Sequence, residues 1–381
     1  DYKSPEFAHI AERISGIKSI QIVRVETNYP INSGESTCDY LQIDNGEIEA
    51  EDGTTTQKPL TPFQKKFCRY LCRVSSLMAE KNALRRLTSF DQIINDFMER
   101  KDEEKIGVPS TLTLTRSQKE QFNTLDVYTF DLENLRQVKM LFYIAEQLDL
   151  FNKFKINARA LFNFIFTVKS KYQDNPYHNW SHALDVLQFN FVIARASGIN
   201  EKLKPIEQLA LYISLISHDI GHVGFSNNFL KQAKMPLSML FNRSILETFH
   251  LSNLIQIMSM PGLNFIQDVD PEDQKIFWET SVHIVLMTDM ERHKEFLETW
   301  DQTVQKGIDW DNPIDRITVL SMFMKVSDIS NCARPFEIAK KWAKRILNEN
   351  FNISFLIMKI LLCIARYLRQ LATLKRKSSI R

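Results

Sequence analysis

The stretch His218-Asp-Ile-Gly-His222 sets two imidazoles and a carboxylate close together in the chain. Two strings of similar composition flank it, His178-Asn-Trp-Ser-His-Ala-Leu-Asp185 on the amino-terminal side and Ser327-Asp-Ile-Ser-Asn331 on the carboxyl-terminal side. Seven of the eight histidines fall within residues 178–293. Neutral imidazole and carboxylate are the ligands that suit zinc, manganese and related divalent metals. The sequence therefore predicts a metal centre assembled from three separated segments.

The residues around these strings follow the apolar period of helices. Apolar side chains recur three and four positions apart over residues 135–148, 161–168 and 206–216, and again over 317–324, where Asp328 closes the pattern. No run of alternating apolar and polar residues indicates strands in this half of the chain. We therefore predict an all-helical architecture there.

Helical spacing gives a first geometry for the metal centre. On an α-helix, residues four apart share one face, so His178 would lie beside His182 and His218 beside His222. Asp219 would lie about 100° around the helix from His218. We therefore expect separate helices to bring these side chains to one site, which is typical of enzymes built inside helical bundles.

The structural alternative to metal binding differs from one histidine to the next. For His283 or His293 alone, a hydrogen-bonded core residue is the more frequent role. Buried ionisable neighbours such as His218, Asp219 and His222 cost several kcal/mol unless they are paired or metal-bound. We therefore interpret that string as metal-binding and the protein as a metallohydrolase.

Composition limits the partners and the location. The 381 residues include 48 Lys and Arg and 46 Asp and Glu, a formal charge of +2, so we expect no nucleic-acid partner. Five cysteines without a CxxC pair argue against a disulfide framework and favour a cytoplasmic location, and we find no secretory leader. The apolar stretch 353–368 is interrupted by Lys359 and Arg366, so we predict a packed helix rather than a transmembrane span. Peripheral membrane attachment is left open.

The first ninety residues have a different character. Residues Ser19 to Val25 are rich in β-branched side chains and predict a strand, and Thr61-Pro62 begins an amphipathic helix. This order resembles the C-terminal half of a GAF domain, a small-molecule sensing module. A plain α/β extension is the alternative. We expect any homodimer contact to lie in this N-terminal region.

Five motifs carry a second resemblance. They are Tyr177 to Asp185, His218 to Asn227, Arg243 to Glu247 with His250, Thr288 to His293, and Val326 to Pro335. In this order they resemble the catalytic domain of class I 3′,5′-cyclic nucleotide phosphodiesterases, from about Phe122 to about Asn350. The resemblance implies a mainly α fold, a compact all-helical catalytic domain of HD type, here with a small α/β N-terminal segment. We divide the chain into a GAF-like segment (1–90), a helix and polar linker (91–118), an incomplete catalytic domain (119–350) and an atypical tail (351–381).

The resemblance also implies roles for individual residues. A tightly bound Zn²⁺ would be held by His182, His218, Asp219 and Asp328. Asp219 would bridge to a second ion, Mg²⁺ or Mn²⁺, whose waters would be anchored by His222, Glu247, His250 and Thr288. His178 would be the general acid. The purine end of the pocket would involve Tyr177, Met290, Ile329 and Asn331.

The chemistry of these residues fits hydrolysis of cAMP or cGMP to the 5′-monophosphate. Two divalent ions with two anionic ligands leave the site positive, which attracts a phosphodiester. They lower the pKa of a shared water, and a protonated imidazole assists a poor alkoxide leaving group.

Departures from the family keep two alternatives open. Phe249 replaces a histidine, Asn350 replaces an aromatic residue, and residues 351–381 do not resemble the family. The tail is either an alternative ending of a gene model or a shortened product. We therefore expect a cyclic nucleotide phosphodiesterase, with another HD-type metal-dependent nucleotide phosphohydrolase and a catalytically impaired phosphodiesterase-like regulatory protein as the alternatives.

Overall fold

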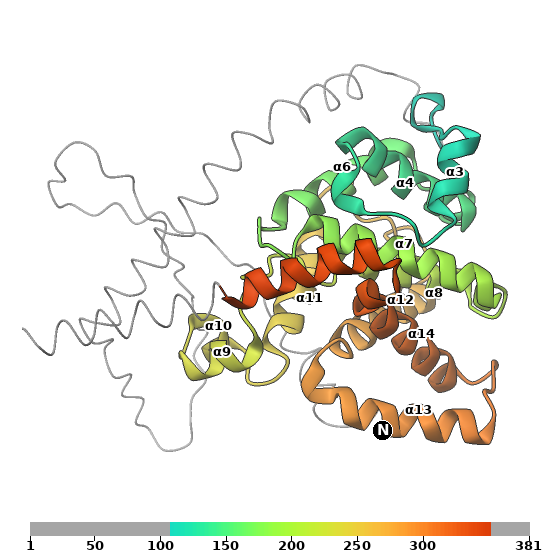
Figure 1. Ribbon diagram of the computed structural model, residues 1–381. Coiled ribbons are helices and arrows are strands. Elements are labelled where there is room, and N and C mark those ends of the chain that lie inside the picture. The colour runs from blue at the N-terminus through green and yellow to red at the C-terminus, as the bar shows by residue number, and fades with distance from the viewer. Residues whose placement is uncertain (1–106, 352–381) are drawn as a thin grey trace, which may run out of the picture. The chain divides into compact units, whose positions relative to one another are not determined.

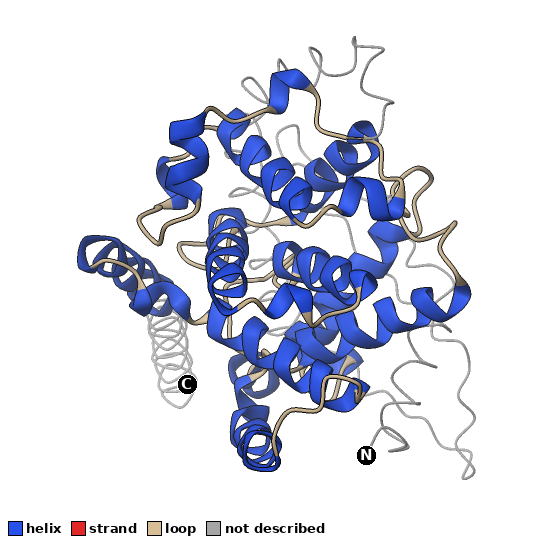
Figure 2. Cartoon of the chain, turned by 90° about the vertical axis from the view of Figure 1, so that its right-hand side faces the viewer, coloured by secondary structure: helices blue, strands red, loops and turns tan. Residues whose placement is uncertain are grey.

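Helices make up nearly all of the regular structure in residues 107–351, which are the residues that the structure, a computed structural model, describes. No strand occurs among them, and Figure 2 shows only helices and loops over this range. The mainly α prediction is confirmed for the residues that the structure describes. The predicted strand at 19–25, the GAF-like segment, the N-terminal dimer contact and the tail from residue 352 lie outside the described residues.

The described elements follow one another with short connections (Figure 1). In chain order they are η2 (Ser110–Leu112), α3 (Arg116–Phe122), η3 (Thr129–Asp131), α4 (Asn134–Gln147), α5 (Leu150–Phe154), α6 (Ala158–Lys171), α7 (Trp180–Ser197), η4 (Ile199–Glu201), α8 (Pro205–Ser217), α9 (Asn227–Gln232), α10 (Pro236–Leu240), α11 (Ile245–Met258), α12 (Pro271–Leu286), η5 (Met290–Arg292), α13 (His293–Lys306), α14 (Pro313–Asp328) and η6 (Ser330–Ala333). A further helix covers residues 336–351 and is drawn in red in Figure 1.

Helices α7, α8, α12 and α14 form the centre of this part of the protein. Helix α8 packs against α7 and α12, and α14 packs against α7 and α12. Every residue of α8 after the exposed Pro205 is buried, as expected for a largely apolar helix at the centre of a core. Each fully buried Leu or Ile contributes about 1.5–3 kcal/mol. This packing fixes the ends of α7, α8 and α14 relative to one another, and the four predicted metal ligands lie at those ends.

The helices begin where side chains can accept the free backbone N–H groups. The side chain of Asn157 caps α6, that of Asn179 caps α7, Asp270 caps α12 and Asn312 caps α14. Pro follows the cap in α12 and α14, where its missing N–H costs nothing. Local sequence therefore sets the start of each of these helices.

The apolar faces predicted from the sequence coincide with buried helix faces. The predicted positions in 161–168 and 206–216 are all buried in α6 and α8. In α4, Leu135 is the exception, because it lies in the first turn and 40% of its surface is exposed. Residues 107–118, predicted as part of a polar linker, include η2, the first residues of α3 and two buried leucines, Leu112 and Leu114.

None of the helices within residues 107–351 combines the length and the apolar character that crossing a bilayer would require.

Candidate active site

The first histidine string lies at the start of α7 rather than along it. Helix α7 begins at Trp180, and the side chain of Asn179 accepts hydrogen bonds from the backbone N–H groups of Ser181 and His182. His178 therefore precedes the helix. The prediction that His178 and His182 share a helix face is wrong, because α7 begins after its cap, Asn179. His182 therefore lies in the helix and His178 lies before it.

The second histidine string lies on a turn that follows α8. The helix ends at Ser217, so the prediction that His218, Asp219 and His222 lie on an α-helix is also wrong. The break comes at Gly221, whose φ of +76° is a left-handed conformation that favours glycine. A Cβ at this position would lie 2.9 Å from Cε1 of Phe249. Both the backbone conformation and the close approach of Phe249 therefore require glycine here.

A single asparagine ties the two turns together. Nδ2 of Asn175 donates to the carbonyl oxygens of His178 (2.9 Å) and His222 (2.7 Å). The backbone segments that carry the histidines are thus joined directly. Asp328 arrives as the last residue of α14, as predicted.

The four predicted metal ligands converge on one point. Their ligand atoms, one each from His182, His218, Asp219 and Asp328, all lie within 4.8 Å of one another. Nε2 of His182 is 3.0 Å from Oδ1 of Asp328, and Nε2 of His218 is 3.2 Å from Oδ2 of Asp219. This is the spacing expected of donors that share one cation.

The hydrogen bonds at His218 leave its metal-facing nitrogen free. Nδ1 of His218 donates to the carbonyl oxygen of Leu215 (3.0 Å), which orients the ring and leaves a lone pair on Nε2. Although Nε2 lies close to Oδ2 of Asp219, neither buried atom makes a hydrogen bond of acceptable geometry. Unsatisfied buried donors and acceptors are costly, and a divalent cation between them would satisfy both. The residues therefore fit a bound metal.

The two carboxylates of this group are held in the ionised form. Burial alone would raise the pKa of Asp328, but the neighbouring imidazoles of His182 and His218 outweigh burial and lower it. The pKa of Asp219 is likewise lowered, against the effect of burial, chiefly by the neighbouring imidazole of His218. Ionised carboxylates are the form that coordinates a metal.

The two oxygens of Asp219 point to different groups. Oδ2 faces Nε2 of His182 (3.5 Å) and of His218, whereas Oδ1 lies 3.6 Å from Nε2 of His250. Nδ1 of His250 donates to the carbonyl oxygen of Ile220 (2.8 Å), so in the neutral ring Nε2 carries a lone pair. Burial lowers the pKa of His250 to about 4, which keeps it neutral. A lone pair that faces a carboxylate oxygen is stable only with a cation or a donor between them.

Next to Asp219, His222 is a hydrogen-bond donor rather than a metal ligand. The backbone N–H of Gly224 donates to Nδ1 of His222 (3.1 Å), so a neutral His222 carries its proton on Nε2. Burial, followed by the charge of His178, lowers the pKa of His222 well below its usual value and keeps it neutral. A protonated nitrogen cannot bind a metal, but it can hold a water.

His178 is bound by a residue that the sequence did not reveal. Nδ1 of His178 lies 2.5 Å from Oε1 of Glu349, and Oε2 accepts the backbone N–H groups of Tyr177 (2.8 Å) and His178 (3.0 Å). Burial would lower the pKa of His178, but the bond to Glu349 and the nearby carboxylates Asp219 and Asp328 raise it overall. Glu349 is itself buried, whereas both of its chain neighbours are exposed. Glu349 is 171 positions from His178 in the sequence, and no sequence pattern indicated their contact.

The ring of His178 stacks on that of His222. Their centroids are 3.9 Å apart and their planes differ by 19°. Because metals bind imidazole nitrogens in the plane of the ring, two stacked rings cannot share one ion. The proximity of His178, His222 and Glu349 is therefore a hydrogen-bonding and stacking arrangement rather than a third metal site.

Tyr177 and Asn331, predicted near the purine, are joined within the protein. The hydroxyl of Tyr177 donates to Oδ1 of Asn331, and Nδ2 of Asn331 donates to Oδ2 of Asp185 (2.8 Å). Arg334 completes the chain of contacts with Nε on the same Asp185 oxygen (3.0 Å). Both Tyr177 and Asn331 are buried, so their polar groups are engaged with neighbours.

The remaining predicted residues divide into exposed and buried ones. Met290 and Ile329 expose 62% and 53% of their surfaces. Glu247 is buried, accepts a hydrogen bond from Nδ2 of Asn227 (2.9 Å), and has its pKa raised to about 7 by burial and the charge of Asp289. Thr288 donates its hydroxyl proton to the carbonyl oxygen of Val285 (2.8 Å).

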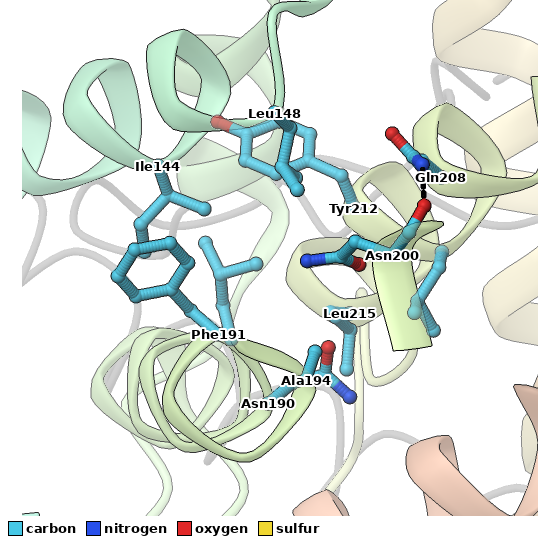
Figure 3. Close-up of a pocket in the computed structure, with 11 residues that line it drawn as sticks. Ile144, Leu148, Asn190, Phe191, Ala194, Asn200, Gln208, Tyr212 and Leu215 are labelled. Atoms are coloured by element: carbon cyan, nitrogen blue, oxygen red, sulfur yellow. Dashed lines mark hydrogen bonds between the residues drawn. The ribbon is translucent and has the colours of Figure 1, made fainter. Parts of the chain in front are cut away.

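Two cavities occur elsewhere in the described residues. Figure 3 shows the first, a space of about 20 Å³ between α4, α7 and α8, where Gln208 donates to the carbonyl oxygen of Asn200. The second, of about 440 Å³, lies between residues 153–160 and 262–273. Neither is lined by a residue of the metal-binding group, so neither is the site of its chemistry.

Comparisons with known proteins agree with this geometry. The family model of 3′5′-cyclic nucleotide phosphodiesterase matches residues 177–359. A cGMP-specific 3′,5′-cGMP phosphodiesterase 3 of Dictyostelium discoideum is 35% identical over 213 residues, 55% of this chain and 46% of that protein. A high affinity cGMP-specific 3′,5′-cyclic phosphodiesterase 9A of Mus musculus is 30% identical over 230 residues, 60% of this chain and 42% of that protein. The chain thus spans less than half of the length of these curated relatives.

A solved structure has the same helical architecture. The phosphodiesterase domain of Salpingoeca rosetta rhodopsin phosphodiesterase superimposes with a TM-score of 0.61 and 26% identity, over 65% of this chain and 77% of that one. The family match covers the histidine strings, Asp328 and Glu349. The segment that carries the four predicted metal ligands thus lies within residues 177–359, which match the 3′5′-cyclic nucleotide phosphodiesterase family model.

Proposed function

We propose that the protein hydrolyses a 3′,5′-cyclic nucleotide to the nucleoside 5′-monophosphate. The observation that carries the proposal is the position of His178 beside the group formed by His182, His218, Asp219 and Asp328. A proton donor and a set of cation ligands next to each other are what cleavage of a phosphodiester requires. The family match and the names of the relatives support the same reaction.

The proposed cofactors are two divalent metals. His182, His218, Asp219 and Asp328 would hold a Zn²⁺, and Oδ1 of Asp219 would contact a Mg²⁺ or Mn²⁺ on the side of His250. When bound, the two ions supply a water of lowered pKa and neutralise charge on the phosphate oxygens. His222, Glu247, His250 and Thr288 would hold waters around the second ion, a role supported for His222 by the proton on its Nε2.

His178 supplies the proton for the leaving group. In hydrolysis the oxygen of one water bonds to phosphorus, the bond from phosphorus to O3′ breaks, and O3′ takes up a proton. Nδ1 of His178 is held by Glu349, so Nε2 is left to face the leaving oxygen. The bond to Glu349 raises the pKa of His178 against the effect of burial, which favours the protonated form that donates. After the transfer, the neutral imidazole regains a proton from solvent.

The proposed substrate pocket would be bordered by the buried, hydrogen-bonded side chains of Tyr177 and Asn331 and by exposed apolar side chains. Tyr177 and Asn331 form a fixed wall, because each is hydrogen-bonded to the other and Asn331 is also bonded to Asp185. The exposed side chains of Ile329 and Met290 offer apolar contact to a purine. The curated relatives described above are named as cGMP-specific, and we propose cGMP as the preferred substrate.

The proposed location is the cytoplasm. The exposed free thiol of Cys332 suits a reducing compartment. Association of two copies through the N-terminal region remains a prediction from the sequence.

The experiment is turnover of cGMP and cAMP by the full chain, compared with His178→Ala. The intact protein should release 5′-GMP in the presence of Zn²⁺ and Mg²⁺, with kcat/KM higher for cGMP than for cAMP. His178→Ala should lose about 10²- to 10⁴-fold in kcat, the contribution typical of a general acid, while its metal content stays unchanged. Loss of metal together with activity would contradict the role given to His178, and turnover of nucleoside triphosphates alone would contradict the substrate.

A further inference from the structure

The helix over residues 336–351 and the loop before His178 are joined at two places. Glu349 accepts the backbone N–H groups of Tyr177 and His178, as described above. One turn earlier on the same helix, Nη1 of Arg345 donates to the carbonyl oxygen of Pro176 (3.2 Å). The carbonyl before Tyr177 and the N–H groups of Tyr177 and His178 are thus all held by one helix.

Arg345 is in turn fixed by the 3₁₀ segment η3 and the residue before it. Its Nε donates to the hydroxyl of Tyr128 (2.8 Å), and its guanidinium carbon lies 3.2 Å from the centroid of the Phe130 ring. The neighbouring turn of the helix is held in the same way, since the ammonium of Lys341 lies 4.5 Å above the Tyr128 ring and 3.5 Å from Oδ2 of Asp131. Two cations of the helix therefore rest on two aromatic rings of one short segment.

The planar guanidinium suits this position better than any other side chain. It donates in fixed directions to two acceptors while its flat face covers an aromatic ring, which an ammonium group cannot do. A cation held against the face of an aromatic ring is attracted by it, and more strongly where the pair is shielded from water. The indole of Trp342 contacts the rings of Tyr128, Phe130 and Tyr177, but these apolar contacts are less directional than the hydrogen bonds of Arg345.

The position of the Glu349 carboxylate depends on these contacts. A single carboxylate orients the His178 ring and accepts two backbone N–H groups, so a shift of the helix displaces all three bonds together. The adjacent Asn348 and Asn350 are exposed. Arg345 joins the helix to Tyr128, the residue before η3, and to the loop before His178.

We propose that Arg345 is a positioning residue, which holds the helix over 336–351 against the Pro176 loop so that Glu349 orients His178. Tyr128 and Phe130 act through it, which couples η3 to the proton donor. The kinetic part of this inference rests on the proposed function, whereas the geometric part does not.

The test compares Arg345→Ala with Lys344→Ala in the metal-loaded full chain. Lys344 is the exposed neighbour on the same helix, so its removal matches the loss of charge. Arg345→Ala should lower kcat about tenfold with KM changed less than about twofold, because a misplaced proton donor affects the transition state and not substrate binding. Hydrogen exchange of the Tyr177 and His178 amides should become faster in Arg345→Ala alone. Tyr128→Phe should change both quantities in the same direction by less.

Each outcome decides the proposal. Unchanged kcat and unchanged exchange at Tyr177 and His178 in Arg345→Ala would overturn it. Loss of metal, or faster exchange throughout α7 and α8, would also overturn it, since Arg345 would then stabilise the whole domain. Arg345→Lys should recover only part of kcat, and full recovery would show that charge alone is needed. If no variant hydrolyses cyclic nucleotide, the proposed function fails, while the exchange measurement still decides the positioning role.

Discussion

At the scale of single residues, the site depends on which atom of each polar group is already engaged. Nδ1 of His218 and Nδ1 of His250 donate to backbone carbonyls, which leaves Nε2 of each ring facing Asp219. Nδ1 of His222 accepts a backbone N–H, which gives that ring the opposite tautomer. Three histidines close together in space thus have different roles, and the backbone partner of each ring assigns them.

The contact between His178 and Glu349 leads to a prediction about pH. Glu349→Gln removes the negative charge that raises the pKa of His178, so burial and the metals then lower it. His178 donates its proton in the reaction, so the pH above which kcat falls should move to a lower value in Glu349→Gln. At neutral pH kcat should fall about ten- to a hundredfold. The pH profile of kcat measures both effects.

Asn348→Gln, an exposed change one position away, is the matched control and should keep the pH profile of the intact protein. Metal content should be the same in both variants. A Glu349→Gln protein with a lower kcat but an unmoved profile would indicate that Glu349 supports the loop without acting on the proton of His178.

At the scale of elements, the apolar period located α4, α6, α8 and α14, and the segments next to the helix ends carry most of the candidate site residues. The buried faces of α6 and α8 follow from residue spacing, because a helix in a core is apolar on the side it buries. The same spacing suggested a helix through His218 and His222, where Gly221 instead turns the chain. The four predicted metal ligands came from the histidine and aspartate motifs together with the family resemblance, whereas Glu349 was not predicted, since a lone acidic residue on a polar helix has no distinguishing pattern.

Gly221 gives the prediction at this scale. Gly221→Ala should destabilise the protein by about 1–3 kcal/mol, because alanine is strained at this φ and its Cβ would approach the Phe249 ring. It should also weaken metal binding, since the turn positions Asp219 and His222. Chemical denaturation and metal titration measure the two effects.

Gly198→Ala separates the cost of the backbone conformation from the cost of the close contact with Phe249. Gly198 also has a positive φ, of 67°, but nothing lies within 4 Å of a Cβ there. This variant should lose only the cost of the backbone conformation and should bind metal normally. Equal destabilisation in the two variants, with metal affinity unchanged in both, would show that the contact with Phe249 is unimportant.

At the scale of the whole molecule, the ligands come from positions that are distant in the chain. His182 is in the first turn of α7, His218 and Asp219 follow α8, and Asp328 ends α14. Their convergence depends on the packing of these three helices against one another, and the ligand set does not exist in the unfolded chain. The fully buried pair of Arg334 and Asp185 and the pair of Arg316 and Glu207 add long-range contacts between the same segments.

The most direct measurement is the position of the metals in crystals of the protein grown with Zn²⁺ and Mn²⁺, located by anomalous scattering at the two absorption edges. We expect one zinc about 2.0–2.2 Å from the ligand atoms of His182, His218, Asp219 and Asp328. We expect a second ion that touches Asp219 but none of the other three. Zinc bound elsewhere, or bound to Asp219 without both His182 and His218, would contradict it.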